Sequence, residues 1–220
     1  MKHIVKGKKP DSLQNYLYKN NNCKYEDLRS DVKKDLRKAL LEEQGYICCY
    51  CMQRIKNNEK TTKIEHWKPQ KKYPDLQLDY KNLLAACKGN EGNEGKKQHC
   101  DTKKSDKEIT INPTHEKCEL NIKYRGDGEI FSDDLVIDNE LNDILNLNMQ
   151  TLRDNREAVI EIVRENITKI KGNDSAWPSN EIKKIIQKYK KKDDGKFKPY
   201  CQAVIYLLEK RISLHYPCAL

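Results

Sequence analysis

Three cysteines crowd into the stretch YICCYC, residues 46–51. Cys48 and Cys51 form a C-x-x-C pair, a tight turn that aims two thiolates at one point, and tetrahedral zinc then needs two more ligands. Cys87 and Cys100 lie downstream, and the chain between them can return easily because closure entropy grows slowly with loop length. We predict that these four cysteines bind one zinc ion. The ion would be structural, because four thiolates leave no open position for water.

These cysteines also allow other interpretations. Cysteine behaves as a small hydrophobic residue, so the cluster could simply fill a core. A thioredoxin-like redox role is weaker, because no strand–helix–strand pattern surrounds the C-x-x-C pair. The second cysteine pair favours zinc over both. Cys49 and His99 stay open as substitutes for one of the four ligands.

The dipeptide Glu65-His66 lies between the two cysteine pairs, in IEHWKP. Ile64 indicates a short strand that Pro69 ends. Adjacent side chains point to opposite faces of a regular strand, so both reach one site only at a strand end or a bulge. A histidine with a near-neutral pKa can take a proton from water. On its own, however, a Glu-His pair is more often a surface dipeptide than a catalytic one.

Three further residues add to this chemistry. Asn82 is predicted at the start of a helix, where its amide can brace a neighbouring loop. Asp101 directly follows a predicted zinc ligand, and a helix beginning near residue 101 would place Lys104 on the same face. There the carboxylate would hold a cation and the lysine would meet a phosphate. With Glu65 as a second cation ligand and His66 as the base, the set suits phosphodiester hydrolysis.

The amino-acid composition is consistent with a phosphodiester-containing partner. The chain has 220 residues, 36% of them hydrophobic and 35% charged, which is typical of a soluble fold with a modest core. No apolar stretch approaches the roughly 18 residues of a membrane span, and no apolar segment follows the basic N-terminus. We therefore expect a cytoplasmic protein, in which cysteines stay reduced and serve as metal ligands. The net charge of +9 suits nucleic acid, although lysine-rich chains are also merely soluble.

Helices are expected around the cysteine-rich region. Residues 26–44 carry leucine and valine at helical spacing, and Gly45 ends that helix. Residues 88–98 contain three glycines and no apolar side chain, which indicates an exposed loop. Residues 108–131 are irregular, with GDGE predicting a turn between two short strands.

The remainder is predicted to be mostly helical. Residues 140–171 have a helical pattern with an interruption near 146–148, and further helices are expected over 179–191 and 199–215. The expected fold class is α+β and mostly helical, with a small zinc-braced module embedded between terminal helices. Its predicted parts are an N-terminal arm and helix (1–45), the zinc module (46–106) and a mainly helical C-terminal region packing on it (107–220).

These motifs resemble the HNH, or ββα-metal, nucleases. Their pattern is C-x-x-C, an acidic residue or histidine before a histidine, Asn-Leu, then C-x-x-C-N-x-x-K, and it reads here CCYC, IEHWKP, NLLAAC and HCDTKK. The resemblance implies Glu65 and Asp101 as ligands of Mg²⁺ or another divalent cation, His66 as the general base and Asn82 as a bracing residue. This sequence departs in two ways: an insertion separates the second cysteine pair, and aspartate replaces the usual asparagine at 101. Aspartate also binds hard cations well.

The resemblance is closest to the PtuB-like HNH nucleases of Septu and retron–Septu antiphage systems, and it extends from MKHIVKGKKP to GKFKPYCQAVIYLLEKRI. It implies a toxic effector that cleaves DNA and works with PtuA, an ABC-type ATPase. In retron versions a reverse transcriptase and its RNA–DNA product, msDNA, join the assembly. Cleavage of tRNA or other structured RNA is an alternative. From the residues alone, a non-catalytic zinc-stabilised module that binds nucleic acid or a partner, and a zinc redox sensor, are the rival interpretations.

Overall fold

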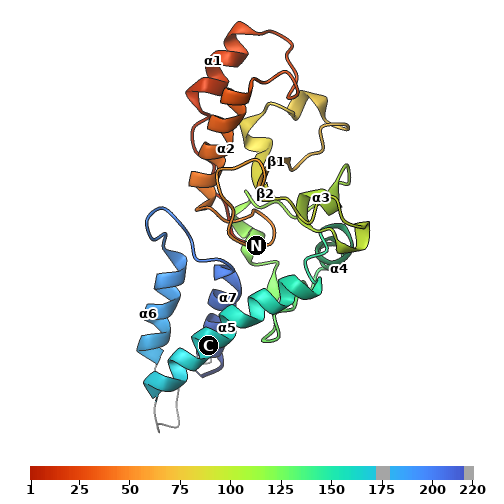
Figure 1. Ribbon diagram of the computed structural model, residues 1–220. Coiled ribbons are helices and arrows are strands. Elements are labelled where there is room, and N and C mark those ends of the chain that lie inside the picture. Colours follow the sequence, from red (N-terminus) through yellow and green to blue (C-terminus); the bar gives the residue numbers. More distant parts are fainter. Residues whose placement is uncertain (172–178, 216–220) are drawn as a thin grey trace.

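Helices are the main regular elements of the structure, a computed structural model that describes residues 1–171 and 179–215 (Figure 1). The helices are α1 Asp11–Lys19, α2 Ser30–Gln44, α3 Cys100–Lys104, α4 Leu135–Asn139, α5 Gln150–Lys171, α6 Ser179–Lys190 and α7 Cys201–His215. The strands are β1 Thr62–His66, β2 Leu83–Cys87, β3 Lys123–Tyr124 and β4 Ile130–Phe131. The prediction of a mostly helical fold with small sheets is confirmed. Within the described ranges, no helix combines the length and hydropathy that crossing a membrane requires.

Helix α2 supports the small β1–β2 sheet. Its apolar residues recur at helical spacing, so they share one buried face, which packs against both strands. The helix begins at Ser30 rather than at 26, and it ends as predicted at Gly45, whose φ of 60° lies in the left-handed region. A side chain at Gly45 would also collide with Phe197, whose backbone nitrogen would lie 2.9 Å from the added Cβ. The helix therefore ends at Gly45 for two reasons, the left-handed backbone conformation and the close packing of Phe197.

Strands β1 and β2 pair antiparallel, with Thr62 opposite Cys87 and His66 opposite Leu83. The prediction that Asn82 starts a helix is wrong: Asn82 ends a short 3₁₀ turn, and strand β2 follows it. All five residues of β2 are buried. A short, continuous apolar run such as LLAAC suits a buried strand as well as a helix, and periodicity alone does not separate the two.

The second part of the chain contains the longer helices. The predicted turn at GDGE joins β3 to β4. Helix α4 continues into a π-helical turn, Glu140–Ile144, and the predicted interruption separates that turn from α5. In Figure 1, α1, α2 and the β1–β2 sheet lie together in one half of the molecule, and α5, α6 and α7 lie in the other, with α6 packed along α7.

Candidate metal centre and active site

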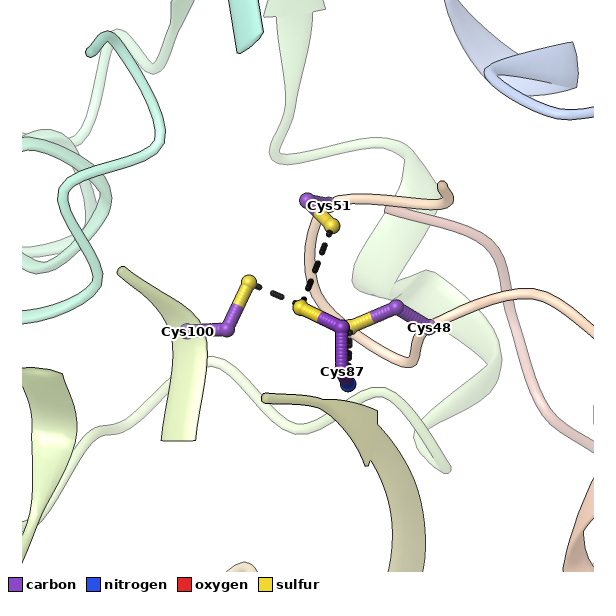
Figure 2. Close-up of side chains that lie close together, drawn as sticks. All are labelled: Cys48, Cys51, Cys87 and Cys100. Atoms are coloured by element: carbon purple, nitrogen blue, oxygen red, sulfur yellow. Dashed lines mark hydrogen bonds between the residues drawn. The ribbon is translucent and has the colours of Figure 1, made fainter. Parts of the chain in front are cut away.

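The four cysteines predicted to bind zinc meet at one point (Figure 2). Cys48 and Cys51 lie in the turn after α2, Cys87 ends β2, and Cys100 begins α3. Their Sγ atoms all lie within 4.8 Å of one another, and all four side chains are buried. The Cys48–Cys100 and Cys51–Cys87 sulfur pairs are each separated by 3.9 Å. Figure 2 shows the sulfur atoms turned toward a common centre.

This arrangement fits a tetrahedral zinc ion. A Zn–S bond of about 2.3 Å implies a sulfur–sulfur separation of about 3.8 Å. Burial raises the pKa of the Cys100 thiol well above its usual range, and the neighbouring thiol of Cys48 raises it further. Four buried thiols this close together can all ionise only around a cation, and zinc deprotonates its cysteine ligands. The buried four-cysteine group is therefore suited to hold zinc.

The two proposed substitutes lie beside the group. The Nδ1 atom of His99 is 3.1 Å from the Cys100 sulfur and 3.9 Å from the Cys87 sulfur, which suits a hydrogen bond to a thiolate. The Cys49 amide donates to Ala85 O at 3.1 Å, and burial raises the pKa of the Cys49 thiol. Neither side chain is a member of the four-sulfur group.

The insertion between Cys87 and Cys100 closes on itself. The His99 amide donates to Gly89 O at 3.0 Å, so the ends of the insertion lie side by side while residues 90–97 are exposed. Gly89 has a φ of 54°, and a Cβ there would lie 2.0 Å from His99 O, so only glycine allows this closure. The inserted residues can therefore project outward without separating the two cysteines.

Glu65 is enclosed at the end of β1 by groups from distant segments. Tyr50 Oη donates to Glu65 Oε1 at 2.6 Å, and Lys104 Nζ lies 2.8 Å from the same oxygen. Because Tyr50 stands inside the C-x-x-C turn, the cysteine centre positions a partner of Glu65. Sequence reasoning missed Tyr50, since no motif marks the residue between the two cysteines.

Asp101 and Glu65 line one surface pocket. Burial, together with the nearby Asp101 charge, raises the pKa of Glu65 well above its usual range. Burial opposes ionisation of Asp101 too, but its hydrogen bond with Glu65 and the charge of Lys63, whose Nζ lies 2.9 Å away, lower its pKa. Two carboxyl groups this close repel each other unless a proton or a cation lies between them. The pair fits a divalent cation, which prefers such oxygen ligands.

His66 lines this pocket as well. Its Nε2 atom is 2.9 Å from Gln77 O, and because a carbonyl can only accept, Nε2 carries the proton and Nδ1 is left as the free base. The Nε2 atom of Gln70 lies 2.9 Å from the same nitrogen, and with the amide turned over, the Gln70 oxygen would accept from this tautomer. The ring also packs edge-on against Tyr25 at 4.7 Å. Burial lowers the pKa of His66 to about 4, so the imidazole is neutral at physiological pH.

Asn82 spans the loop that follows His66. Its Oδ1 accepts from the Lys68 amide at 2.7 Å, and its Nδ2 donates to Lys68 O at 3.0 Å and to Leu76 O at 3.1 Å. The backbone carbonyl of Asn82 also accepts from the Trp67 amide at 3.0 Å. This is the geometry that a bracing role requires, although the residue reaches it from a 3₁₀ turn rather than from a helix.

Lys104 lies inside the site rather than on the surface. Its side chain is 1% exposed, and Nζ donates to His66 O at 3.0 Å in addition to its ion pair with Glu65. The lysine thereby links the two residues at the end of β1 and neutralises charge beside them. Contact with a substrate phosphate stays a prediction.

Removing the Asn82 amide should destabilise the protein. We expect Asn82→Ala to lower the free energy of unfolding by about 2–4 kcal/mol, because backbone groups on both sides of the loop lose their partners. Urea denaturation of the zinc-loaded protein measures this. Asn93→Ala, which removes a single exposed hydrogen bond to Asn90 O, serves as the control and should stay within about 0.5 kcal/mol of the parent. Equal urea-denaturation midpoints for Asn82→Ala and Asn93→Ala would contradict the bracing role.

Two curated proteins are similar to this chain, whereas no protein-family model matches it. A 79-residue region is 38% identical to "Septu protein PtuB" of Bacillus thuringiensis and covers 36% of this chain and 28% of that protein. A 129-residue region is 30% identical to "Retron Vc95 putative HNH endonuclease" of Vibrio cholerae serotype O1 biovar El Tor, covering 55% of this chain and 60% of that protein. The chain thus matches less than two thirds of the length of either relative. These similarities confirm the resemblance that the motifs predicted.

Proposed function

We propose that this chain, a relative of the PtuB-like HNH proteins of Septu and retron systems, is a metal-dependent HNH endonuclease and the toxic effector of an antiphage defence system. The observation that carries the proposal is the convergence of Glu65, His66 and Asp101 on one pocket beside a buried four-cysteine group. Strands β1 and β2 and helix α3 follow one another in the chain in the order of a ββα-metal module, which supports the proposal.

The residues of the pocket divide the work of phosphodiester hydrolysis. Glu65 and Asp101 would hold a divalent cation, Mg²⁺ or another, which when bound supplies charge stabilisation at the scissile phosphate. His66 Nδ1 takes a proton from the attacking water as the new P–O bond forms and the bond to the leaving oxygen breaks. Gln77 O holds the ring tautomer, and it stabilises the imidazolium once the proton has moved. The zinc at the four cysteines is structural in this scheme.

The proposed substrate is DNA, with tRNA or other structured RNA as the alternative. The net charge of +9 supports a polynucleotide partner without distinguishing between the two. We further propose that a PtuA-like ABC-type ATPase controls the nuclease, since one relative carries the name PtuB, and that a retron reverse transcriptase with its msDNA joins it in retron contexts.

Variants at position 101 test this function. The chain is co-expressed with a PtuA-like ATPase, and all cellular DNA and RNA ends are sequenced after activation. The new ends identify the substrate. We expect Asp101→Ala to reduce new ends by about 100-fold, because the cation loses a ligand. Asp101→Asn should retain most of the cleavage, because an amide oxygen also binds hard cations. Unchanged cleavage by Asp101→Ala would contradict the proposal, and an unchanged phenotype without cleavage would favour the non-catalytic binding module.

A further inference from the structure

A second charged cluster lies on the loop after His66. The Glu108 carboxylate accepts from three donors on that loop: Lys72 Nζ at 2.6 Å, Tyr73 Oη at 2.8 Å and Lys68 Nζ at 3.2 Å. These hydrogen bonds lower the pKa of Glu108 to about 2, with the bond from Lys72 contributing most. None of the four residues has a part in the hydrolytic scheme above.

Two of the three donors, Lys68 and Tyr73, are held in place independently of Glu108. Both backbone groups of Lys68 are bonded to the Asn82 amide, and the Lys68 ammonium lies 4.8 Å from the ring centre of Trp67 and 5.2 Å from that of Tyr73. The two aromatic faces attract this cation and restrict its position. The Tyr73 amide donates to Pro69 O at 2.9 Å, which fixes the turn that carries the phenol. Such a preorganised set loses little conformational entropy on binding an anion.

The cluster also adjoins the proposed active site. Pro69 and Gln70, from the same loop, line the pocket of His66, and so does Asp106, which lies two residues before Glu108. Lys68 is 27% exposed, Lys72 60% and Glu108 31%, so a ligand can approach from solvent. Ion pairs between solvent-exposed groups contribute little to stability, so a phosphate can displace the Glu108 carboxylate.

Two ammonium groups and a phenol directed at the two oxygens of one carboxylate are suited to bind the two anionic oxygens of a phosphodiester. We propose that Lys68, Lys72 and Tyr73 bind a backbone phosphate of the polynucleotide substrate, and that Glu108 occupies this phosphate site in the free protein. The inference rests on the proposed function and extends it: Asn82 braces the proposed base and the substrate anchor together. Glu108 then competes with substrate, which weakens binding until a phosphate replaces its carboxylate.

Binding measurements on the full chain carrying His66→Ala test this site without cleavage of the probe. Fluorescence anisotropy reports the Kd for labelled DNA and RNA oligonucleotides of one sequence, each single- and double-stranded, across a salt series. We expect Lys68→Gln with Lys72→Gln to weaken binding by about 10-fold and to reduce the salt slope by about 1–2. The matched control is Lys96→Gln with Lys97→Gln on the exposed 90–97 loop, which removes the same charge and should change Kd by less than about threefold.

Glu108→Gln separates a phosphate site from a structural ion pair. It removes the competitor, so we expect Kd to fall by about 3- to 10-fold, whereas Glu94→Gln, with the same charge change beside Lys96, should have a smaller effect. Any of three results would overturn the proposed site. They are an equal change in Kd for Glu108→Gln and Glu94→Gln, an equal change in Kd for the two lysine pairs, and no binding by the parent at low salt. The DNA and RNA arms identify the source of the phosphate. The proposed nuclease function is judged separately, by cleavage, so the two proposals can fail independently.

Discussion

Replacing His66 with alanine is expected to lower phosphodiester cleavage by about 10²- to 10⁴-fold, the usual contribution of a general base. The Nε2 atom is committed to Gln77 O, so the proton must move to Nδ1, and no other imidazole lines the pocket within the described part of the chain. The protein should stay folded, because the substitution removes few interactions beyond the hydrogen bond and the edge contact with Tyr25. A quantitative cleavage assay and a thermal melt, performed on the same preparation, measure both effects.

The exposed His115 provides the control. Its ring accepts one hydrogen bond from the Lys117 amide at 3.2 Å, and His115→Ala should cleave at the parental rate. Cleavage by His66→Ala at that rate would exclude His66 as the base. If the cellular phenotype survives replacement of both His66 and Glu65, and if oxidants release the zinc, the redox-sensor interpretation is favoured instead.

Loss of zinc is expected to unfold the region around the cysteines. The ion would join the turn after α2 to the end of β2 and the start of α3, three segments whose buried thiols lie close together. Structural zinc contributes about 10–16 kcal/mol in small domains, which matches or exceeds the total stability of most proteins. We therefore expect Cys87→Ser, or chelation of the parent, to lower the melting temperature by more than about 10 °C.

Zinc stoichiometry and melting temperature measured together test the ligand set. The parent should contain one zinc ion per chain, and Cys87→Ser should contain much less. Cys23→Ser is the control, because Cys23 is only half-buried and lies outside the four-cysteine group. Cys49→Ser should likewise retain zinc. Full zinc content in Cys87→Ser, or its loss in Cys49→Ser, would show that the four ligands are assigned wrongly.

Short-range patterns were sufficient to predict several features. Cysteine spacing predicted which four thiols would converge, because a C-x-x-C turn and two cysteines at the ends of a closable loop restrict the available geometries. The end of α2 at Gly45 and the hairpin at GDGE also follow from local backbone preferences. The C-x-x-C turn, the end of α2 and the hairpin each depend on residues close together in the chain.

Tertiary packing decided the features that depend on distant segments. Periodicity left β2 indistinguishable from a helix. Its antiparallel pairing with β1, supported by packing against α2, makes it a strand, and Asn82 therefore lies in the turn before it. The enclosure of Lys104 beside Glu65, the approach of Tyr50 and the meeting of Glu108 with the loop after His66 each join parts of the chain that no local motif relates. The energy of a buried charge depends on which groups surround it, and only the folded chain determines those neighbours.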